Sequence, residues 1–76
     1  MQNLYEQNIR QIRKSRNLLQ KDVAKELGIE VSYLYMIENG MRNPSDKLKI
    51  QLCKLYGIDM NTLFLALKLT KCKKTK

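Results

Sequence analysis

Four residues that interrupt regular backbone divide this chain into short segments, and between them the apolar residues recur at helical spacing. They are Gly28, Gly40, Pro44 and Gly57, the only glycines and the only proline in 76 residues. Glycine adopts the left-handed conformations that end helices, and proline lacks the amide hydrogen that a helix interior needs. Apolar positions three and four residues apart share one face of a helix. The chain is therefore predicted to form five short helices and no strand, with linkers of roughly two to six residues.

Capping residues mark most of the predicted helix ends. Asn3, Ser45 and Asp59 are good N-cap residues, and Asn17 can take the left-handed conformation that stops a helix. Leu19 precedes the second helix and cannot cap it, at an expected cost of about 1 kcal/mol. The helices are expected at residues 4–15, 20–27, 31–39, 45–56 and 59–69. The inward-facing residues are expected to be Tyr5, Ile9, Ile12, Val23, Ala24, Leu27, Leu34, Ile37, Leu48, Leu52, Leu55, Tyr56, Met60, Leu63, Phe64 and Leu67.

Length and charge divide the chain into one domain and a tail. Seventy-six residues leave room for one small domain, and 15 Lys and Arg against 7 Asp and Glu give a net charge of +8. Five of these cations and no anion lie between Lys68 and Lys76, so residues 1–67 are only mildly basic. A charge run of this kind is typically solvated. We expect residues 1–69 to form the domain and residues 70–76 a basic, disordered tail.

Several classes of function are excluded by what the composition lacks. The chain has no histidine and two cysteines, Cys53 and Cys72, which cannot build a four-ligand zinc site or a thiol–imidazole catalytic pair. It has no glycine-rich phosphate loop and no carboxylate cluster. We therefore expect no enzyme, no metal, no cofactor and no small-molecule substrate. The absence of a disulfide framework, a secretory signal and a long apolar run predicts a cytoplasmic protein that does not bind membranes.

The stretch from Gln20 to Ser45 joins two of the predicted helices at close spacing. Ala24 is a small residue on the inner face of the first helix, Gly28 provides the sharp exit, and Ile29 can pack beneath the turn. A helix-turn-helix requires this arrangement, because the second helix must cross the first closely and then project outward. Such a projecting helix can enter the major groove of DNA.

In these residues the sequence resembles the Cro/CI-type helix-turn-helix family, which includes phage repressors and xenobiotic-response-element regulators. The resemblance covers residues 8–67, and it is carried by Gln20, by Leu27-Gly28-Ile29, by Leu34, by Ile37-Glu38-Asn39-Gly40 and by Arg42-Asn43-Pro44-Ser45. It implies an all-α, compact five-helix, lambda-repressor-like domain whose helix-turn-helix is formed by the second and third helices. It also implies a regulator of transcription that binds double-stranded DNA.

The resemblance implies roles for individual residues. Gln20 occupies the place of a glutamine that bonds a phosphate, and Arg42 and Asn43 lie in a loop that touches the DNA backbone. Arg13 and Glu38 resemble a structural ion pair between the first and third helices. The positions that face bases, or flank those that do, are Val31, Ser32, Tyr33, Tyr35, Met36 and Asn39.

Helical periodicity independently places part of this set on one face. Ser32, Met36 and Asn39 are spaced i, i+4 and i+7 and lie opposite the expected core residues Leu34 and Ile37. This face has no arginine or glutamine, the side chains that pair bases through two hydrogen bonds, and Asn39 is its only amide. We expect it to read thymine methyl groups or the shape of the DNA.

Two functions of different class remain open from the sequence. The first is a repressor acting as a homodimer on a two-fold operator, with Leu65 and Leu69 on the last helix as an apolar dimer interface. The second is the antitoxin, or another protein-interaction module, of a two-component regulatory pair, in which a protein partner is bound as well as DNA. The leucines of the last helix suit either function.

Overall fold

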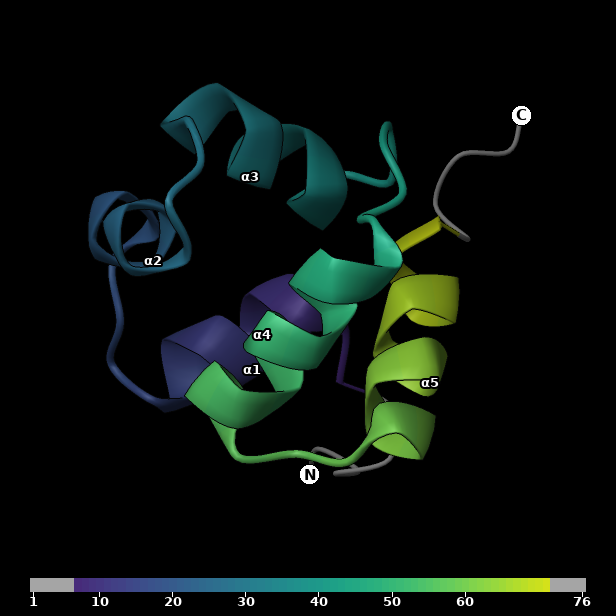
Figure 1. Cartoon of the computed structure of the whole chain (residues 1–76). Coiled ribbons are helices and arrows are strands. Elements are labelled where there is room, and N and C mark those ends of the chain that lie inside the picture. The colour runs from purple at the N-terminus through teal and green to yellow at the C-terminus, as the bar shows by residue number, and fades with distance from the viewer. Residues whose placement is uncertain (1–6, 72–76) are drawn as a thin grey trace.

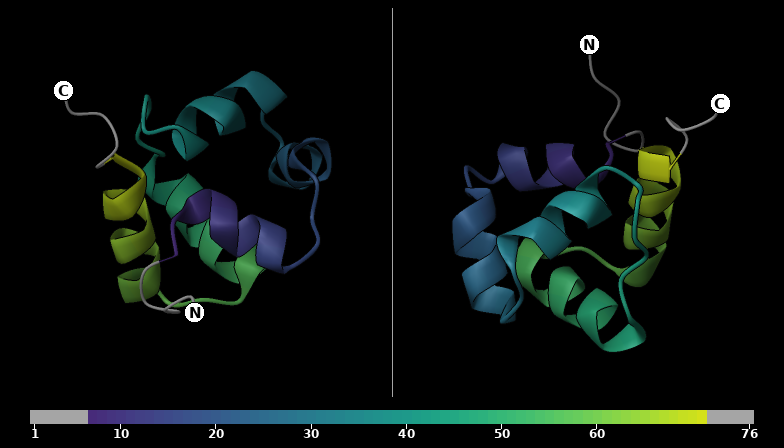
Figure 2. Two further views of the ribbon diagram at one scale, coloured as in Figure 1. Left: turned by 180° about the vertical axis from the view of Figure 1, so that it is seen from behind. Right: turned by 90° about the horizontal axis from the view of Figure 1, so that it is seen from above.

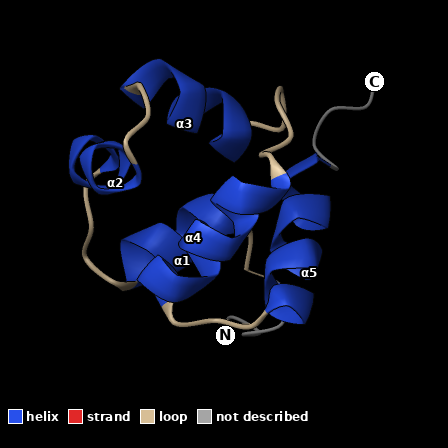
Figure 3. Ribbon diagram, viewed as in Figure 1, coloured by secondary structure: helices blue, strands red, loops and turns tan. Residues whose placement is uncertain are grey.

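The computed structural model describes residues 7–71, and within that range every regular element is an α-helix (Figure 3). The helices are α1 (Ile9–Ser15), α2 (Gln20–Leu27), α3 (Val31–Glu38), α4 (Asp46–Tyr56) and α5 (Met60–Lys71). The all-α, five-helix architecture expected from the sequence is confirmed.

The helices surround one core. α1 and α4 lie between α2 on one side and α5 on the other, and α3 lies at the end away from the α4–α5 connection (Figures 1 and 2). Every helix contributes to the buried apolar cluster, which consists of Ile9, Ile12, Val23, Ala24, Leu27, Leu34, Ile37, Leu48, Leu52, Tyr56, Leu63, Ala66 and Leu67. This core holds α3 at the surface with one side buried and the other exposed.

The predicted start of the first helix is wrong. α1 begins at Ile9, and Asn8 is its N-cap with φ −85° and ψ 177°. The Asn8 side chain accepts a hydrogen bond from the Gln11 N–H at 2.9 Å, and the Gln11 side chain accepts one from the Asn8 N–H at 2.8 Å. This capping box satisfies two amides at the helix start. Asn3, the expected N-cap, and Tyr5, which we expected in the first helix, lie outside the described residues.

The last helix extends past its predicted end near Leu69. α5 continues to Lys71, and Thr70 is buried with only 2% of its surface exposed. The Thr70 hydroxyl donates to the Ala66 carbonyl at 2.8 Å and accepts from the Ile9 N–H at 3.3 Å. The chain up to Thr70 is therefore part of the packed structure, and the remainder of the predicted tail, residues 72–76, lies outside the described residues.

One predicted core residue of α5 faces outward. Phe64 is 49% exposed, whereas Ala66 and Thr70 are buried with Leu63 and Leu67. The inner face of α5 is thus rotated from the predicted one toward two small side chains. Met60 and Leu55 are partly buried against the core.

Candidate nucleic-acid interface

The turn between α2 and α3 positions the outer helix. Gly28 ends α2 in the left-handed region, with φ 71° and ψ 34°. Ala24 is 1% exposed, and its carbonyl accepts a hydrogen bond from the Ile29 N–H at 3.0 Å. Ile29 packs against the core, and α3 begins two residues later at Val31. The small side chain and the short turn let α3 cross α2 closely, which is the geometry of a helix-turn-helix.

α3 presents a mostly exposed outer face. Leu34 and Ile37 are buried on its inner side, with 0% and 1% of their surface exposed. The structure leaves most of the expected base-facing and flanking residues accessible: Val31, Ser32, Tyr35 and Asn39 are exposed, and Tyr33 and Met36 are half-buried. An α-helix fits the width of a major groove. Because one side of α3 is exposed and the other is packed against the core, α3 can enter such a groove.

A buried ion pair fixes the end of α3 to α1. The Arg13 Nε lies 2.7 Å from the Glu38 Oε2, and the side chains are 7% and 0% exposed. A second guanidinium nitrogen donates to the Glu38 Oε1 at 3.2 Å, and the third donates to the Leu18 carbonyl at 2.8 Å. All three nitrogens of the guanidinium are therefore engaged. The pair expected between these residues is present, and its contacts are structural.

Gln20 connects the start of α2 to the same carboxylate. Its side-chain amide nitrogen donates to the Glu38 Oε1 at 2.9 Å. This bond fixes the side chain and leaves its carbonyl oxygen and a second N–H for another partner. Leu19, the N-cap residue of α2, makes no side-chain capping bond, as its sequence predicts. The first amides of α2 are therefore not covered by a capping side chain.

A polar hollow lies over this network. It has a volume of about 430 Å³ and is lined by Arg10, Arg13, Gln20, Tyr35, Glu38 and Asn39. Arg10, on α1, is exposed. It was not among the residues singled out from the sequence, because its position beside the ends of α2 and α3 depends on how α1 packs. Its presence adds a positive charge at the edge of the α3 face.

Tyr56 is buried near the ion pair. Its hydroxyl has no hydrogen-bond partner among residues 7–71. Burial raises the pKa of Tyr56 far above its ordinary value, and the negative charge of Glu38 adds to that effect. The Arg16 Nε donates to the Tyr56 carbonyl at 2.6 Å, which ties the end of α1 to the end of α4. This bond stabilises the scaffold beneath the exposed face, whereas the unpartnered hydroxyl does not.

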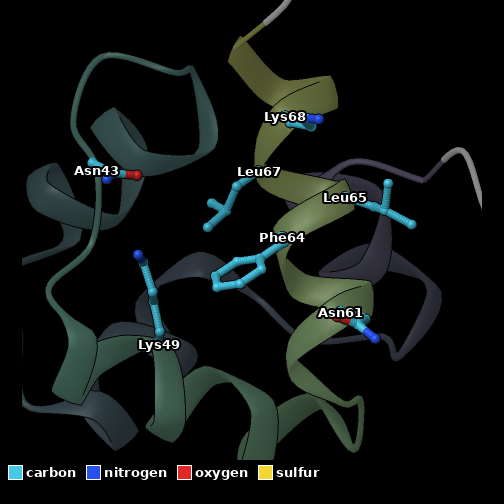
Figure 4. Close-up of a pocket in the computed structure, with 7 residues that line it drawn as sticks. All are labelled: Asn43, Lys49, Asn61, Phe64, Leu65, Leu67 and Lys68. Atoms are coloured by element: carbon cyan, nitrogen blue, oxygen red, sulfur yellow. The ribbon is translucent and has the colours of Figure 1, made fainter.

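The connection from α3 to α4 places two expected DNA-contacting residues in different surroundings. The Arg42 guanidinium lies over the Tyr33 ring, 5.1 Å from its centroid. Asn43 instead lines a groove of about 650 Å³ between this connection, α4 and α5, and its side chain points toward that groove (Figure 4). Arg42 is thus beside α3, whereas the Asn43 side chain is turned toward α5.

The groove beside α5 has an apolar floor and a polar rim. Phe64 and Leu67 point into it, and Leu65 lies at its edge with its side chain directed away from these two (Figure 4). Its remaining lining residues are Asn43, Lys49, Asn61 and Lys68. The Lys49 ammonium lies 5.4 Å from the centroid of the Phe64 ring, which accounts for a lysine at this partly buried position of α4. Of the two leucines expected at an interface, Leu65 is 47% exposed and Leu69 is half-buried.

Two kinds of feature are absent from residues 7–71. No group of three or more His, Cys, Asp or Glu side chains there could hold a metal ion. None of the described helices is both long enough and apolar enough to cross a membrane.

Comparison with known proteins identifies similar sequences. The sequence profile of a family described as helix-turn-helix matches residues 9–63. An HTH-type transcriptional regulator of Methanocaldococcus jannaschii is 37% identical over 49 residues, which are 64% of this chain and 74% of that protein. The ImmF control region 10 kDa protein of Bacillus phage phi105 is 40% identical over 55 residues, which are 72% of this chain and 61% of that protein. No solved structure matches significantly.

Proposed function

Since the chain belongs to the Cro/CI-type helix-turn-helix family of DNA-binding transcriptional regulators, we propose that it is a repressor that binds a two-fold operator as a homodimer. Members of this family bind DNA and are not enzymes. The similarity to a protein of a phage control region supports a regulatory role. A dimer on a promoter would exclude RNA polymerase from the same DNA, and the protein would act in the cytoplasm.

The exposed outer face of α3 is the observation that carries the proposal. Val31 and Tyr35 on this face are 43% and 51% exposed, although both are large and could have been buried in the core. A phosphate contact from Gln20 would help to set the position of the helix in the groove, and the α3 face would then meet base edges. Arg10 would add to the positive potential along the same side.

The proposed dimer contact is the apolar surface of α5. Phe64 and Leu65 are about half exposed and adjoin the groove beside α4. Recognition helices of a dimer must lie roughly 34 Å apart to reach successive major grooves. The principal dimensions of the molecule are 30 × 27 × 21 Å. Two copies packed side by side therefore have a suitable size for one operator, and a second copy is the occupant that we propose for the groove.

Fluorescence anisotropy tests the proposed repressor. The purified protein is titrated against duplex DNA from upstream of its own gene and against a scrambled duplex, over a salt series. Tight binding to its own DNA that persists at about 150 mM salt, with release of the scrambled duplex, is the expected result. Equal binding to both duplexes that disappears together as salt rises would contradict a sequence-specific regulator.

Sedimentation tests the dimer. We expect a species of twice the 9.0 kDa chain mass at micromolar concentration. Leu65→Glu should shift it to the monomer, because two carboxylates would be buried at a two-fold contact. Ile50→Glu is the matched control, since Ile50 is 51% exposed on α4 and does not line the groove. A monomer for the unmodified chain would contradict the dimer.

A second candidate function is the antitoxin or protein-interaction module, and the same groove is the observation that favours it. In that case the unmodified chain would sediment as a monomer. It would form a stoichiometric complex with the product of a neighbouring gene, and Leu65→Glu would abolish that complex. A dimer that Leu65→Glu dissociates would count against this candidate.

A further inference from the structure

The outer face of α3 has little capacity to pair bases by itself. Reading a base through two hydrogen bonds requires a guanidinium or an amide with both of its polar atoms available. Asn39 is the only amide at the outer face of α3, and one of its two N–H groups donates to the Tyr35 carbonyl of the same helix at 2.8 Å, so only the other N–H and the carbonyl oxygen remain for a base. The remaining exposed residues, such as Val31 and Ser32, offer methyl groups and a hydroxyl. A regulator with this face needs another side chain to supply sequence discrimination.

The connection after α3 folds back so that Arg42 lies beside that face. The N–H groups of Met41 and Arg42 both donate to the Met36 carbonyl, at 2.8 and 3.3 Å. Arg42 is exposed, and its guanidinium lies over the ring of Tyr33, on the first turn of α3. Among residues 7–71 the ion pairs are Arg13–Glu38 and Lys49–Asp46, so no described carboxylate neutralises Arg42.

We propose that Arg42 is a specificity-determining residue that reads a guanine in the major groove while its guanidinium lies over the ring of Tyr33; this inference rests on the proposed binding of DNA. A cation–π contact uses none of the N–H groups of the guanidinium as hydrogen-bond donors, so these groups stay free for a base. Guanine presents two acceptors, O6 and N7, at a spacing that such an edge matches. Arg42 thus supplies the paired donors that α3 lacks.

The aromatic contact distinguishes a base from a phosphate as the partner. A phosphate can be met by a mobile arginine from many directions, because the attraction is mainly between charges. A base edge demands a defined plane, and immobilising a long side chain beforehand lowers the entropy lost on binding. Tyr33 belongs to the helix expected to enter the groove and packs against the core. It therefore favours positions of the Arg42 side chain beside that helix.

Selection from a library of random DNA duplexes tests this role, first with the unmodified protein. We expect an enriched motif with a required guanine in each half-site. With Arg42→Ala the preference at that position should be lost while the rest of the motif remains, and Arg42→Lys, which can still donate to guanine, should retain part of it. Replacing that guanine by 7-deazaguanine, which lacks N7, should weaken binding of the unmodified protein about tenfold or more and leave Arg42→Ala unaffected.

Two variants of Tyr33 and one charge control complete the experiment. Tyr33→Phe retains the ring and should retain the guanine preference, whereas Tyr33→Leu should weaken it without unfolding the domain, which melting curves check. Lys47→Ala removes an exposed cation of α4 and should leave the motif unchanged. An Arg42→Ala motif identical to the original, with affinity lowered alike on every duplex and a salt slope reduced by about one, would show a phosphate contact and overturn the inference. A failure of the unmodified protein to enrich any motif would overturn the proposed function as well.

Discussion

Replacement of Arg13 by alanine is expected to remove much of the stability of the domain. The Glu38 carboxylate, which is 0% exposed, would lose its charged partner and two of its three hydrogen bonds, and only the bond from Gln20 would remain. Breaking a buried pair on one side costs about 3 kcal/mol or somewhat more. A domain of this size has a total stability of only roughly 4–11 kcal/mol. Because about 4–8 °C of melting temperature corresponds to 1 kcal/mol at this length, a fall of roughly 12–24 °C is expected.

Urea denaturation and thermal melting, both followed by circular dichroism, measure this loss. Lys14→Ala is the matched control, since Lys14 is the next residue of α1, carries the same charge and is exposed. It should change the free energy of unfolding by less than about 0.5 kcal/mol. A double variant, Arg13→Met with Glu38→Met, should recover much of the loss because no buried charge then lacks a partner. An Arg13→Ala protein as stable as the Lys14→Ala protein would refute the reasoning.

Two smaller perturbations test the ends of α5. The Thr62 N–H and side chain hold the pKa of the Asp59 carboxyl below its ordinary value of 3.8, so its contribution to stability is present above that value and is lost as pH falls through the lowered pKa. Compared with Asp59→Ala, the unmodified protein should therefore melt higher at neutral pH, and this advantage should shrink below about pH 4, as melting over a pH series will measure. Thr70→Val should cost about 1–3 kcal/mol in urea denaturation because it leaves the buried Ile9 N–H without an acceptor, whereas Thr70→Ser should cost less.

Local sequence patterns predicted some helix ends correctly and left others ambiguous. α2 was predicted at the residues where it is found, because Asn17, Gly28 and the apolar stripe between them all indicate the same segment. At α1 the N-cap expected from the sequence is Asn3, but Asn8 with Gln11 is a second capping pattern five residues further along. The structure forms the second, and the Ile9 N–H then pairs with Thr70, 61 residues away. A contact so distant in the sequence is not visible in local patterns.

The difference between the predicted and the observed inner face of α5 had another cause. The predicted inner face counted large apolar residues and so included Phe64, whereas the structure buries Ala66 and Thr70 in its place. A small residue allows α5 to approach its neighbours, and the buried hydroxyl is tolerated because both of its hydrogen bonds are made within the protein. Hydrophobic periodicity does not record either effect, because it scores alanine weakly and threonine as polar.

Hydrophobic periodicity predicted which residues lie on the outer face of α3. It did not predict the contacts between helices and connections that complete the candidate interface. Ser32 and Asn39 are exposed opposite Leu34 and Ile37, which the spacing alone predicts. The Gln20–Glu38 bond and the Arg42–Tyr33 contact join different elements, and the second depends on the path of a connection that has no periodic pattern. The roles of these residues in binding DNA remain predictions.

The contacts around α3 separate the stability of the domain from the proposed reading of bases. Glu38 accepts hydrogen bonds from α1 and from the start of α2, so the end of α3 and the first turn of α2 are held as one unit by a carboxylate that no solvent reaches. Arg42 is held by backbone bonds to Met36 and by the ring of Tyr33, all at or near the surface. Substitutions at Arg42 should therefore change which DNA is bound and leave the melting temperature nearly unchanged. Substitutions at Glu38 should lower the melting temperature and reduce binding to every duplex alike, because they act on the position of the whole helix.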